Sequence, residues 1–261
     1  METTMAPSTL TTAQRIGIYV KEARYQFLMM ARVPAFVFPT LAFPLMFYLF
    51  FGVIMGTRGF SLAVPTYLLV TYGVFGIIGP AMFGFGVGIA NERDEGSLQL
   101  KRTTPMPASA YLFAKSMMAV LFATGVVIGL FSLAAYAGGV TLYREQWLLL
   151  AALLIGGTLP FCAMGLAIGS WTSAQAAIAI VNLTYLPMAF FSGLWFPIMI
   201  FPEAMQRFAM SFPPYHLAQI ALKVIDMDQG KPLTLHLAVL GAYTVLFMVL
   251  ATLGFRRVTP S

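Results

Sequence analysis

The stretch from Val64 to Pro107 reads VPTYLLVTYGVFGIIGPAMFGFGVGIANERDEGSLQLKRTTPMP. Residues 64–90 carry no charged side chain, whereas residues 92–102 carry six. These six are Glu92, Arg93, Asp94, Glu95, Lys101 and Arg102. A helix needs about 20 apolar residues to cross the hydrocarbon core of a bilayer. The stretch therefore predicts a membrane-spanning helix that ends in a short, highly charged segment outside the hydrocarbon.

The whole chain has the composition of a membrane protein. Of its 261 residues, 59% are hydrophobic and 9% are charged, whereas soluble domains contain about 25% charged residues. Its mean hydropathy is +0.84. The single cysteine, Cys162, has no partner in the chain for a disulfide. We predict an all-α polytopic membrane protein.

Six segments are long and apolar enough to span a bilayer. They are residues 33–55, 64–90, 110–138, 146–170, 176–198 and 232–255. The first apolar run exceeds the apolar core of a signal peptide, about 7–15 residues, so we expect it to be retained as a span. The sequence thus divides into an N-terminal part, residues 1–32, and one transmembrane domain, residues 33–257. Within that domain we expect residues 91–109 on one side of the membrane and residues 199–231 on the other.

The basic residues predict the orientation, because cytoplasmic loops carry the excess of Lys and Arg. An even number of spans places both termini on one side. That side would hold ten of the fifteen basic residues: Arg15, Lys21, Arg24, Arg32, Arg93, Lys101, Arg102, Lys115, Arg256 and Arg257. We therefore predict that both termini are cytoplasmic. The pI near 9.5 reflects this topology, and we do not expect a nucleic-acid partner.

Several kinds of site are missing from the sequence. The predicted spans contain no Asp or Glu, which disfavours an ion-driven carrier and an intramembrane acid-base enzyme. His216 and His236 fall far short of a metal-ligand cluster and are expected to be interfacial. The chain has no catalytic motif and no phosphate-binding GxxxxGK[ST] loop, so we expect no catalytic residue, no metal and no bound ATP. The glycines of residues 84–88, with Gly165 and Gly169, indicate close helix packing.

Two amphipathic pieces flank the spans. Residues 13–32 place apolar side chains at helical spacing, which predicts a helix lying on the cytoplasmic leaflet among membrane lipids, as a simple anchor or as a lever. Its apolar positions are Ile16, Val20, Ala23, Phe27 and Met30. Residues 201–212 predict a short outer helix that begins after Pro202 and stops at Pro213–Pro214. Before it, Pro187 and Gly193 are expected to interrupt the fifth span.

The charged segment itself favours a short helix from Glu92 to Thr103. Its acidic residues come early and its basic residues late, as suits the helix dipole; a solvated loop is the alternative. The segment matches the pattern E-x-x-x-G-[ST]-L, then [ST]-P, then Lys, at Glu92, Gly96-Ser97-Leu98, Thr104-Pro105 and Lys115. This resembles the type-two ABC exporter permeases, and the resemblance extends over nearly the whole chain through Ser192–Pro197 and Pro202–Gln206. The Lys101-Arg102 pair departs from the apolar continuation of many relatives.

The resemblance implies a division of labour between subunits. The charged segment would be a coupling helix that docks onto a separate ABC ATPase subunit, which would bind ATP and Mg²⁺, while this chain would bind no cofactor. The implied coupling residues are Glu92, Arg93, Glu95, Gly96, Leu98, Thr104, Pro105 and Lys115. The permease would act in the bacterial cytoplasmic membrane as a dimer of like chains, or of unlike chains.

The resemblance also implies that spans two and five line the transport path. The candidate lining residues are Phe75, Phe83, Phe85, Phe190 and Phe191, while Trp195 and Phe196 form either an outer gate or an aromatic belt. The few polar residues in the spans favour a hydrophobic or amphipathic substrate, a drug or a lipid. The alternatives are export of a lipid-linked glycan and, from other classes, a lipid-acting membrane enzyme or a membrane anchor.

Overall fold

A computed structural model describes residues 11–56, 63–103 and 106–258. These residues form helices joined by turns, and they contain no strand. In chain order the elements are α1 (Thr12–Ala31), α2 (Pro34–Phe47), η1 (Tyr48–Met55), α3 (Ala63–Met82), η3 (Phe83–Val87), α4 (Gly88–Asp94), α5 (Ser97–Arg102), α6 (Ala108–Tyr136), α7 (Arg144–Gly156), α8 (Thr158–Trp171), α9 (Ala174–Phe191), η4 (Ile198–Ile200), α10 (Glu203–Ala209), α11 (Pro213–Lys223) and α12 (Leu233–Val258).

Six continuous helical segments in the described residues are long and apolar enough to cross a membrane. They run over Pro34–Met55, Val64–Asp94, Ser109–Tyr136, Arg144–Trp171, Ala174–Phe191 and Leu233–Arg256. The prediction of an all-helical chain with six candidate spans is therefore confirmed. The division into an N-terminal part, one transmembrane domain and an external segment stays a prediction.

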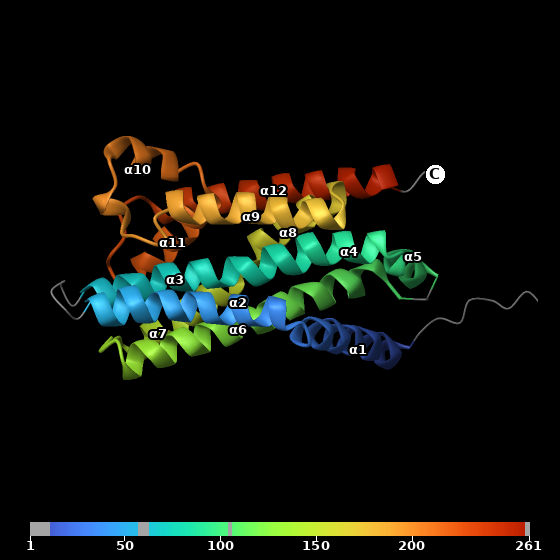
Figure 1. The fold of residues 1–261 in the computed structure, drawn as a ribbon, viewed down its shortest axis with the longest axis horizontal. Coiled ribbons are helices and arrows are strands. Elements are labelled where there is room, and N and C mark those ends of the chain that lie inside the picture. Colours follow the sequence, from blue (N-terminus) through green and yellow to red (C-terminus); the bar gives the residue numbers. More distant parts are fainter. Residues whose placement is uncertain (1–10, 57–62, 104–105, 259–261) are drawn as a thin grey trace, which may run out of the picture.

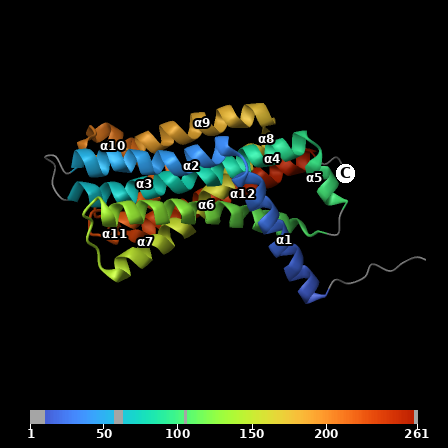
Figure 2. The ribbon, with the colours of Figure 1, turned by 60° about the horizontal axis from the view of Figure 1, so that its bottom comes forward.

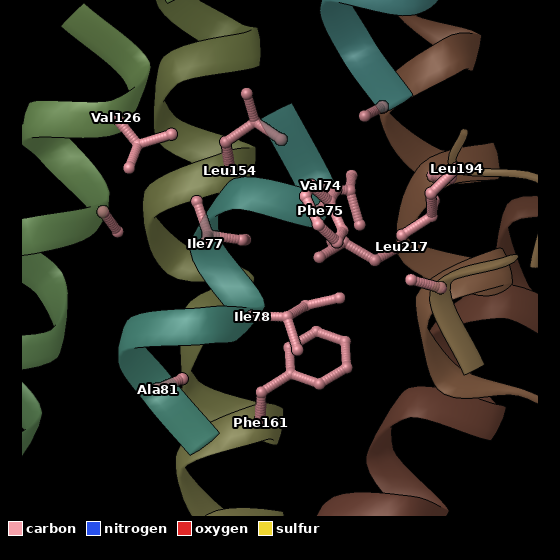
Figure 3. Close-up of a cluster of buried hydrophobic side chains, with 14 of the residues drawn as sticks. Val74, Phe75, Ile77, Ile78, Ala81, Val126, Leu154, Phe161, Leu194 and Leu217 are labelled. Atoms are coloured by element: carbon pink, nitrogen blue, oxygen red, sulfur yellow. The ribbon is translucent and has the colours of Figure 1, made fainter. Parts of the chain in front are cut away.

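The second span is the centre of the bundle. Of its apolar window, 94% is buried inside the protein, against 17% for the first span and for the last. Figure 3 shows how Ile77 and Ile78 of α3 pack among side chains from several other helices, including Leu154 of α7 and Phe161 of α8. The first and last spans therefore leave most of their apolar surface for lipid or for another chain.

Small residues let α8 approach the second span closely. A Cβ atom on Gly169 would lie 2.6 Å from the carbonyl oxygen of Gly86, and one on Gly165 would lie 3.0 Å from that of Met82. Real Cβ atoms do not come so near a backbone atom as the first of these distances. The glycines thus serve close helix packing, as the sequence indicated.

The bundle has two distinct ends (Figures 1 and 2). The helices α1 and α5 and the C-terminal end of α12 lie at one end, while α10 and α11 lie at the opposite end. Helix α1 diverges from the bundle in Figure 2 but packs against α6, where the Tyr19 hydroxyl lies 2.7 Å from that of Ser109. Of its apolar stripe, Ile16 and Val20 remain about 60% exposed. These two residues are available to contact something outside the protein.

The charged segment differs from the expected helix over Glu92–Thr103. The helix of the second span continues through α4 to Asp94, turns at Gly96, and α5 begins only at Ser97. Gly96 has a φ of +74°, a conformation that glycine adopts without strain. Glu92 therefore belongs to the second span, and the expectation that the spans lack carboxylates was wrong.

Two further expectations about proline are corrected. Pro187 does not interrupt the fifth span, since α9 continues through it to Phe191, and the break comes at Gly193. Pro213 and Pro214 do not merely end the outer helix. They form the first turn of a new helix, α11, where a missing N–H costs nothing because it would have no helical partner.

Candidate functional site

A buried ion pair joins the ends of the second and third spans. The Glu92 carboxylate of α4 lies 2.8 Å from the Nζ atom of Lys115 in α6, and Lys115 is fully buried. The fold provides the space for this ammonium group, because a Cβ atom on Gly88 would come within 3.0 Å of it. A lone buried charge is strongly unfavourable, so each member of the pair depends on the other.

The pair extends into a cluster that also includes α1 and α5. Lys101 of α5 lies 2.8 Å from the Glu22 carboxylate of α1 and 3.4 Å from that of Glu92. Gln26 of α1, which is fully buried, donates to Glu22 at 3.2 Å and to Glu92 at 3.4 Å, and accepts from Lys115 at 3.4 Å. We call these five residues the charge cluster. It ties four helices together with two acidic and two basic groups.

The charge cluster contains equal numbers of acidic and basic groups, which limits what it can bind. Its carboxylates already have ammonium partners, so it holds no spare charge for a transported ion. Among the described residues no group of three His, Cys, Asp or Glu side chains could hold a metal ion. The cluster is suited to fixing the position of α5 relative to α1, α4 and α6.

Helix α5 presents one face to the protein and another to solvent. Leu98 packs against the core, whereas Leu100 is 69% exposed and Gln99 and Glu95 are exposed beside it. An exposed leucine among polar residues on a short projecting helix suits a contact with another protein. The candidate residues Thr104 and Pro105 lie outside the described residues.

Arg93 and Asp94 lie on a different side of α4. The Arg93 guanidinium donates to the carbonyl oxygens of Gly169 and Ser170, both at 3.2 Å, and to that of Thr172. The Asp94 carboxylate accepts from the backbone N–H of Ala174 at 2.7 Å. These two side chains therefore contact the turn between α8 and α9, away from the exposed face of α5.

A small cavity opens between α2, α3 and α9. It has a volume of about 150 Å³, and its lining includes Phe75 and Phe83 of α3 and η3 and Asn182 and Tyr185 of α9. The Tyr185 ring stacks on Phe75 with centroids 5.1 Å apart, and its hydroxyl donates to the Phe75 carbonyl oxygen at 2.9 Å. We call this cavity the groove. Two of the candidate lining residues, Phe75 and Phe83, lie in it, and both come from span two, whereas its span-five residues, Asn182, Tyr185 and Leu186, were not among the candidates.

The other candidate aromatic residues lie elsewhere. Phe85 is buried and lines a separate cavity with Cys162 and Met248. Trp195 lies within 6.1 Å of the rings of Phe47, Phe75 and Phe190, measured between centroids. Phe190 also contacts Phe191 and Phe201. Phe191 contacts Phe208 and Phe212, and Phe196 contacts Phe51. Trp195 therefore contacts the groove lining through Phe75, and Phe190 packs against Trp195.

The opposite end of the bundle buries a pair of histidines. The Nδ1 atoms of His216 in α11 and His236 in α12 are 2.9 Å apart, and both side chains are buried. Burial lowers the pKa of His216 below its usual value of 6.5. The expectation of ordinary interfacial histidines did not anticipate this mutual hydrogen bond.

Sequence reasoning also missed Gln26 and Asp94. Gln26 follows Glu22 by four residues, the spacing of neighbours on one helix face. That polar pair next to an apolar stripe was a usable sign of an inward polar face. Asp94 gave no such sign, because its partner is a backbone amide 80 residues away.

The six long apolar helices are those of a multi-pass membrane protein. Residues 61–253 match the family described as ABC-2 family transporter protein. The chain therefore belongs to the ABC-2 transporter family. It is 28% identical over 218 residues to a protein of Bacillus subtilis (strain 168) named as a transport permease, YvfS. The aligned region covers 83% of this chain and 88% of that protein.

Membership of this family decides the class of protein. An ABC-2 permease is the membrane subunit of an ABC transporter, a transport component and not an enzyme, and it implies an ATPase partner subunit. The resemblance seen in the sequence is thereby confirmed.

Proposed function

We propose that this chain is the permease of an ATP-driven exporter, acting as two permease chains with two ATPase subunits. The ATPase subunits would bind ATP and Mg²⁺, and their closure would move the α5 end of each permease. The groove and its counterpart in the second permease would then open toward the outside. Both termini and α5 would lie on the cytoplasmic side of the bacterial cytoplasmic membrane, as the excess of basic residues at that end favours.

The observation that carries the proposal is the link between α5 and the spans through Lys101. This ammonium group lies 2.8 Å from Glu22 and 3.4 Å from Glu92, and Glu92 pairs with the buried Lys115. Force applied to α5 would therefore reach α1 and α4 directly through Lys101, and α6 through the buried Glu92–Lys115 pair. The exposed Leu100, with Glu95 and Gln99, supplies the surface on which an ATPase subunit would bind.

The first and fifth spans supply the surface for a second chain. Most of their residues are not buried, and the groove lies between them beside the second span. Phe38 of α2 and Leu183 of α9 are more than 70% exposed. A like permease is the simplest partner for such a face, because isologous contacts use the same patch twice.

The lining of the groove supports a hydrophobic or amphipathic substrate. Its polar side chains are Thr40, Asn182 and Tyr185, and Tyr185 already donates to a backbone carbonyl. A glycan would require many more hydrogen-bonding groups along its path. Drugs and lipids need few polar contacts and a large apolar surface.

The flanking amphipathic helices have roles at the two membrane surfaces. We propose that α1 lies on the cytoplasmic leaflet, with Ile16 and Val20 among the lipids, and moves with α5 through Glu22, which pairs with Lys101. On the outer side, α10 and α11 would cover the outer mouth of the pathway, near Trp195. This assignment makes α1 a lever as well as an anchor.

The test is copurification of the tagged chain from gently solubilised membranes, with mass spectrometry of what comes with it. We expect a stoichiometric soluble protein that carries a phosphate-binding loop and hydrolyses ATP. The Leu100→Asp variant should lose it, because the charge falls on an exposed residue of α5 that the fold does not need. Glu92 is less suited to this test, since replacing it leaves Lys115 buried without its partner.

The matched control is Arg207→Ala at the other end of the molecule. Arg207 pairs with Glu203 on an exposed surface, so its loss should leave the partner bound. A chain that purifies alone would contradict the proposal, as would an ATPase that binds the Leu100→Asp variant as tightly as the wild type.

A further inference from the structure

The turn between α8 and α9 is held from both sides by neighbouring residues of α4. Arg93 donates to the carbonyl oxygens of Gly169, Ser170 and Thr172, where α8 ends. Asp94 accepts from the N–H of Ala174, where α9 begins. The last carbonyls and first amides of a helix lack partners within it. One pair of residues thus satisfies the end of one helix and the start of the next.

The contacts have the polarity that these helix ends prefer. A cation is favourable at the carbonyl end of α8, and an anion at the amide end of α9. The planar guanidinium can donate to several oxygens at once, which an ammonium group cannot do in the same fixed geometry. The two side chains also lie near each other, with Arg93 and Asp94 forming an ion pair at 3.4 Å.

The surroundings leave the turn little freedom to move away from α4. Gly169 already touches the second span, since a Cβ atom there would lie 2.6 Å from the Gly86 oxygen. On its far side the Trp171 indole donates to the Leu250 carbonyl oxygen of α12 at 2.8 Å. The turn is therefore fixed between the second and the last span.

We infer that Arg93 and Asp94 form a clamp through which movement of the α4–α5 corner reaches α9. This inference rests on the proposed function, because it assumes that an ATPase subunit moves α5. The second span needs no such device, since α3, η3 and α4 form one continuous helix up to the corner. The fifth span has no covalent link to that corner except through the whole of α6, α7 and α8. Arg93 and Asp94 would thus be positioning residues of the fifth span.

The clamp connects α9 to the corner in addition to its contacts inside the groove, where Tyr185 stacks on Phe75 and donates to its carbonyl oxygen. Phe83 on the second span would follow the corner through the helix itself, whereas Asn182 on α9 would follow it mainly through Arg93 and Asp94. Breaking the clamp should therefore affect the Asn182 wall more than the Phe83 wall. A residue with a merely structural role would not separate the two.

The experiment measures labelling of single cysteines by a hydrophilic maleimide in the permease–ATPase complex. The reporters are Asn182→Cys and Phe83→Cys, each in a Cys162→Ala background that removes the only native cysteine. Labelling is compared without nucleotide and after trapping with ATP and vanadate. The clamp variants are Arg93→Gln and Asp94→Ala. Because the Asp94 side chain is 40% exposed, Asp94→Ala should fold even if Arg93→Gln does not. Arg207→Gln is the matched control.

We expect the clamp variants to keep the ATP-dependent change at Phe83→Cys and to lose most of it at Asn182→Cys. Asp94→Asn, which retains an oxygen acceptor for Ala174, should restore most of the Asn182 change. If the variants keep both changes, or lose both while the ATPase stays bound, the clamp is refuted and the proposed function stands. If the wild-type complex itself shows no ATP-dependent change at either reporter, the proposed function fails and the clamp fails with it.

Discussion

The two ends of the bundle bury polar side chains in opposite ways. At the α5 end, four charged residues neutralise one another and, with the hydrogen bonds of Gln26, join four helices. At the α11 end, two histidines share one hydrogen bond between two helices. Opposite charges keep their attraction at every pH near neutrality, whereas a histidine pair requires at least one neutral ring. The first arrangement therefore persists over a wide range of pH, whereas the second depends on the pH around it.

The largest loss of stability should come from Lys115→Met. It leaves the Glu92 carboxylate buried without its closest partner, which costs about 3–5 kcal/mol of stability. Thermal unfolding in detergent measures this effect, with the loss of the monodisperse peak in size-exclusion chromatography as the readout. The double variant Glu92→Gln with Lys115→Met removes both buried charges and should recover most of the loss. A single variant as stable as the wild type would mean that the pair is not buried as described.

Two glycines with the same backbone conformation sharpen the comparison. Gly96 and Gly193 both have a φ of +74°, but an added Cβ meets nothing at Gly96 and lies 2.9 Å from the Ile198 Cβ at Gly193. Gly96→Ala should cost about 1–2 kcal/mol of stability from backbone strain alone. Gly193→Ala should cost the same strain and about 1–3 kcal/mol more from overpacking. Melting temperatures of the two variants check the order. Equal losses would contradict the contact at Ile198.

The histidine pair should make stability depend on pH. Because burial lowers the folded-state pKa of His216 below 6.5, the unfolded chain binds the proton more readily. Stability from this group is therefore full above pH 6.5 and is lost as the pH falls through the lower, folded-state pKa. His216→Gln should flatten that dependence and, at neutral pH, cost about 1–3 kcal/mol by leaving His236 with a poorer partner. Melting curves at a series of pH values test both effects, and an unchanged slope in the variant would exclude His216 as their source.

The smallest effect should come from an ion pair that is not buried. Arg207 and Glu203 of α10 form a pair in which both side chains are more than 70% exposed. Arg207→Ala should change stability by less than about 1 kcal/mol, because water and salt already screen such a pair. The same melting assay applies, and a loss near that of Lys115→Met would show that α10 is covered by another chain.

The sequence predicted the six spans well, because a span depends on a local property. Apolarity summed over about 20 consecutive residues is enough to identify one. Helix ends were harder. Pro213–Pro214 could either stop a helix or begin one, and only the packing of α11 against α12 and α3 distinguishes the two. Pro187 gave the same ambiguity inside α9, where the helix tolerates it.

The candidate site was predicted in part. The motif around Glu92, Gly96 and Lys115, identified by its resemblance to a family pattern, included two members of the charge cluster; the coupling role of these residues stays a prediction. The direction in which each side chain points was not available, so Glu92 and Arg93 were both expected to face a partner protein. Glu92 instead faces Lys115, and Arg93 faces the end of α8.

The sequence by itself determined the membrane class, the six spans, the excess of basic residues at one end and the family. These follow from hydropathy, charge counts and short motifs, which need no knowledge of distant contacts. Only the tertiary structure decided which charges are paired, that Gln26 lies among them, and that Arg93 and Asp94 hold the α8–α9 turn. The physical reason is that the environment of a buried polar group depends on partners about 20 to 90 residues away in the chain, and only folding brings them together.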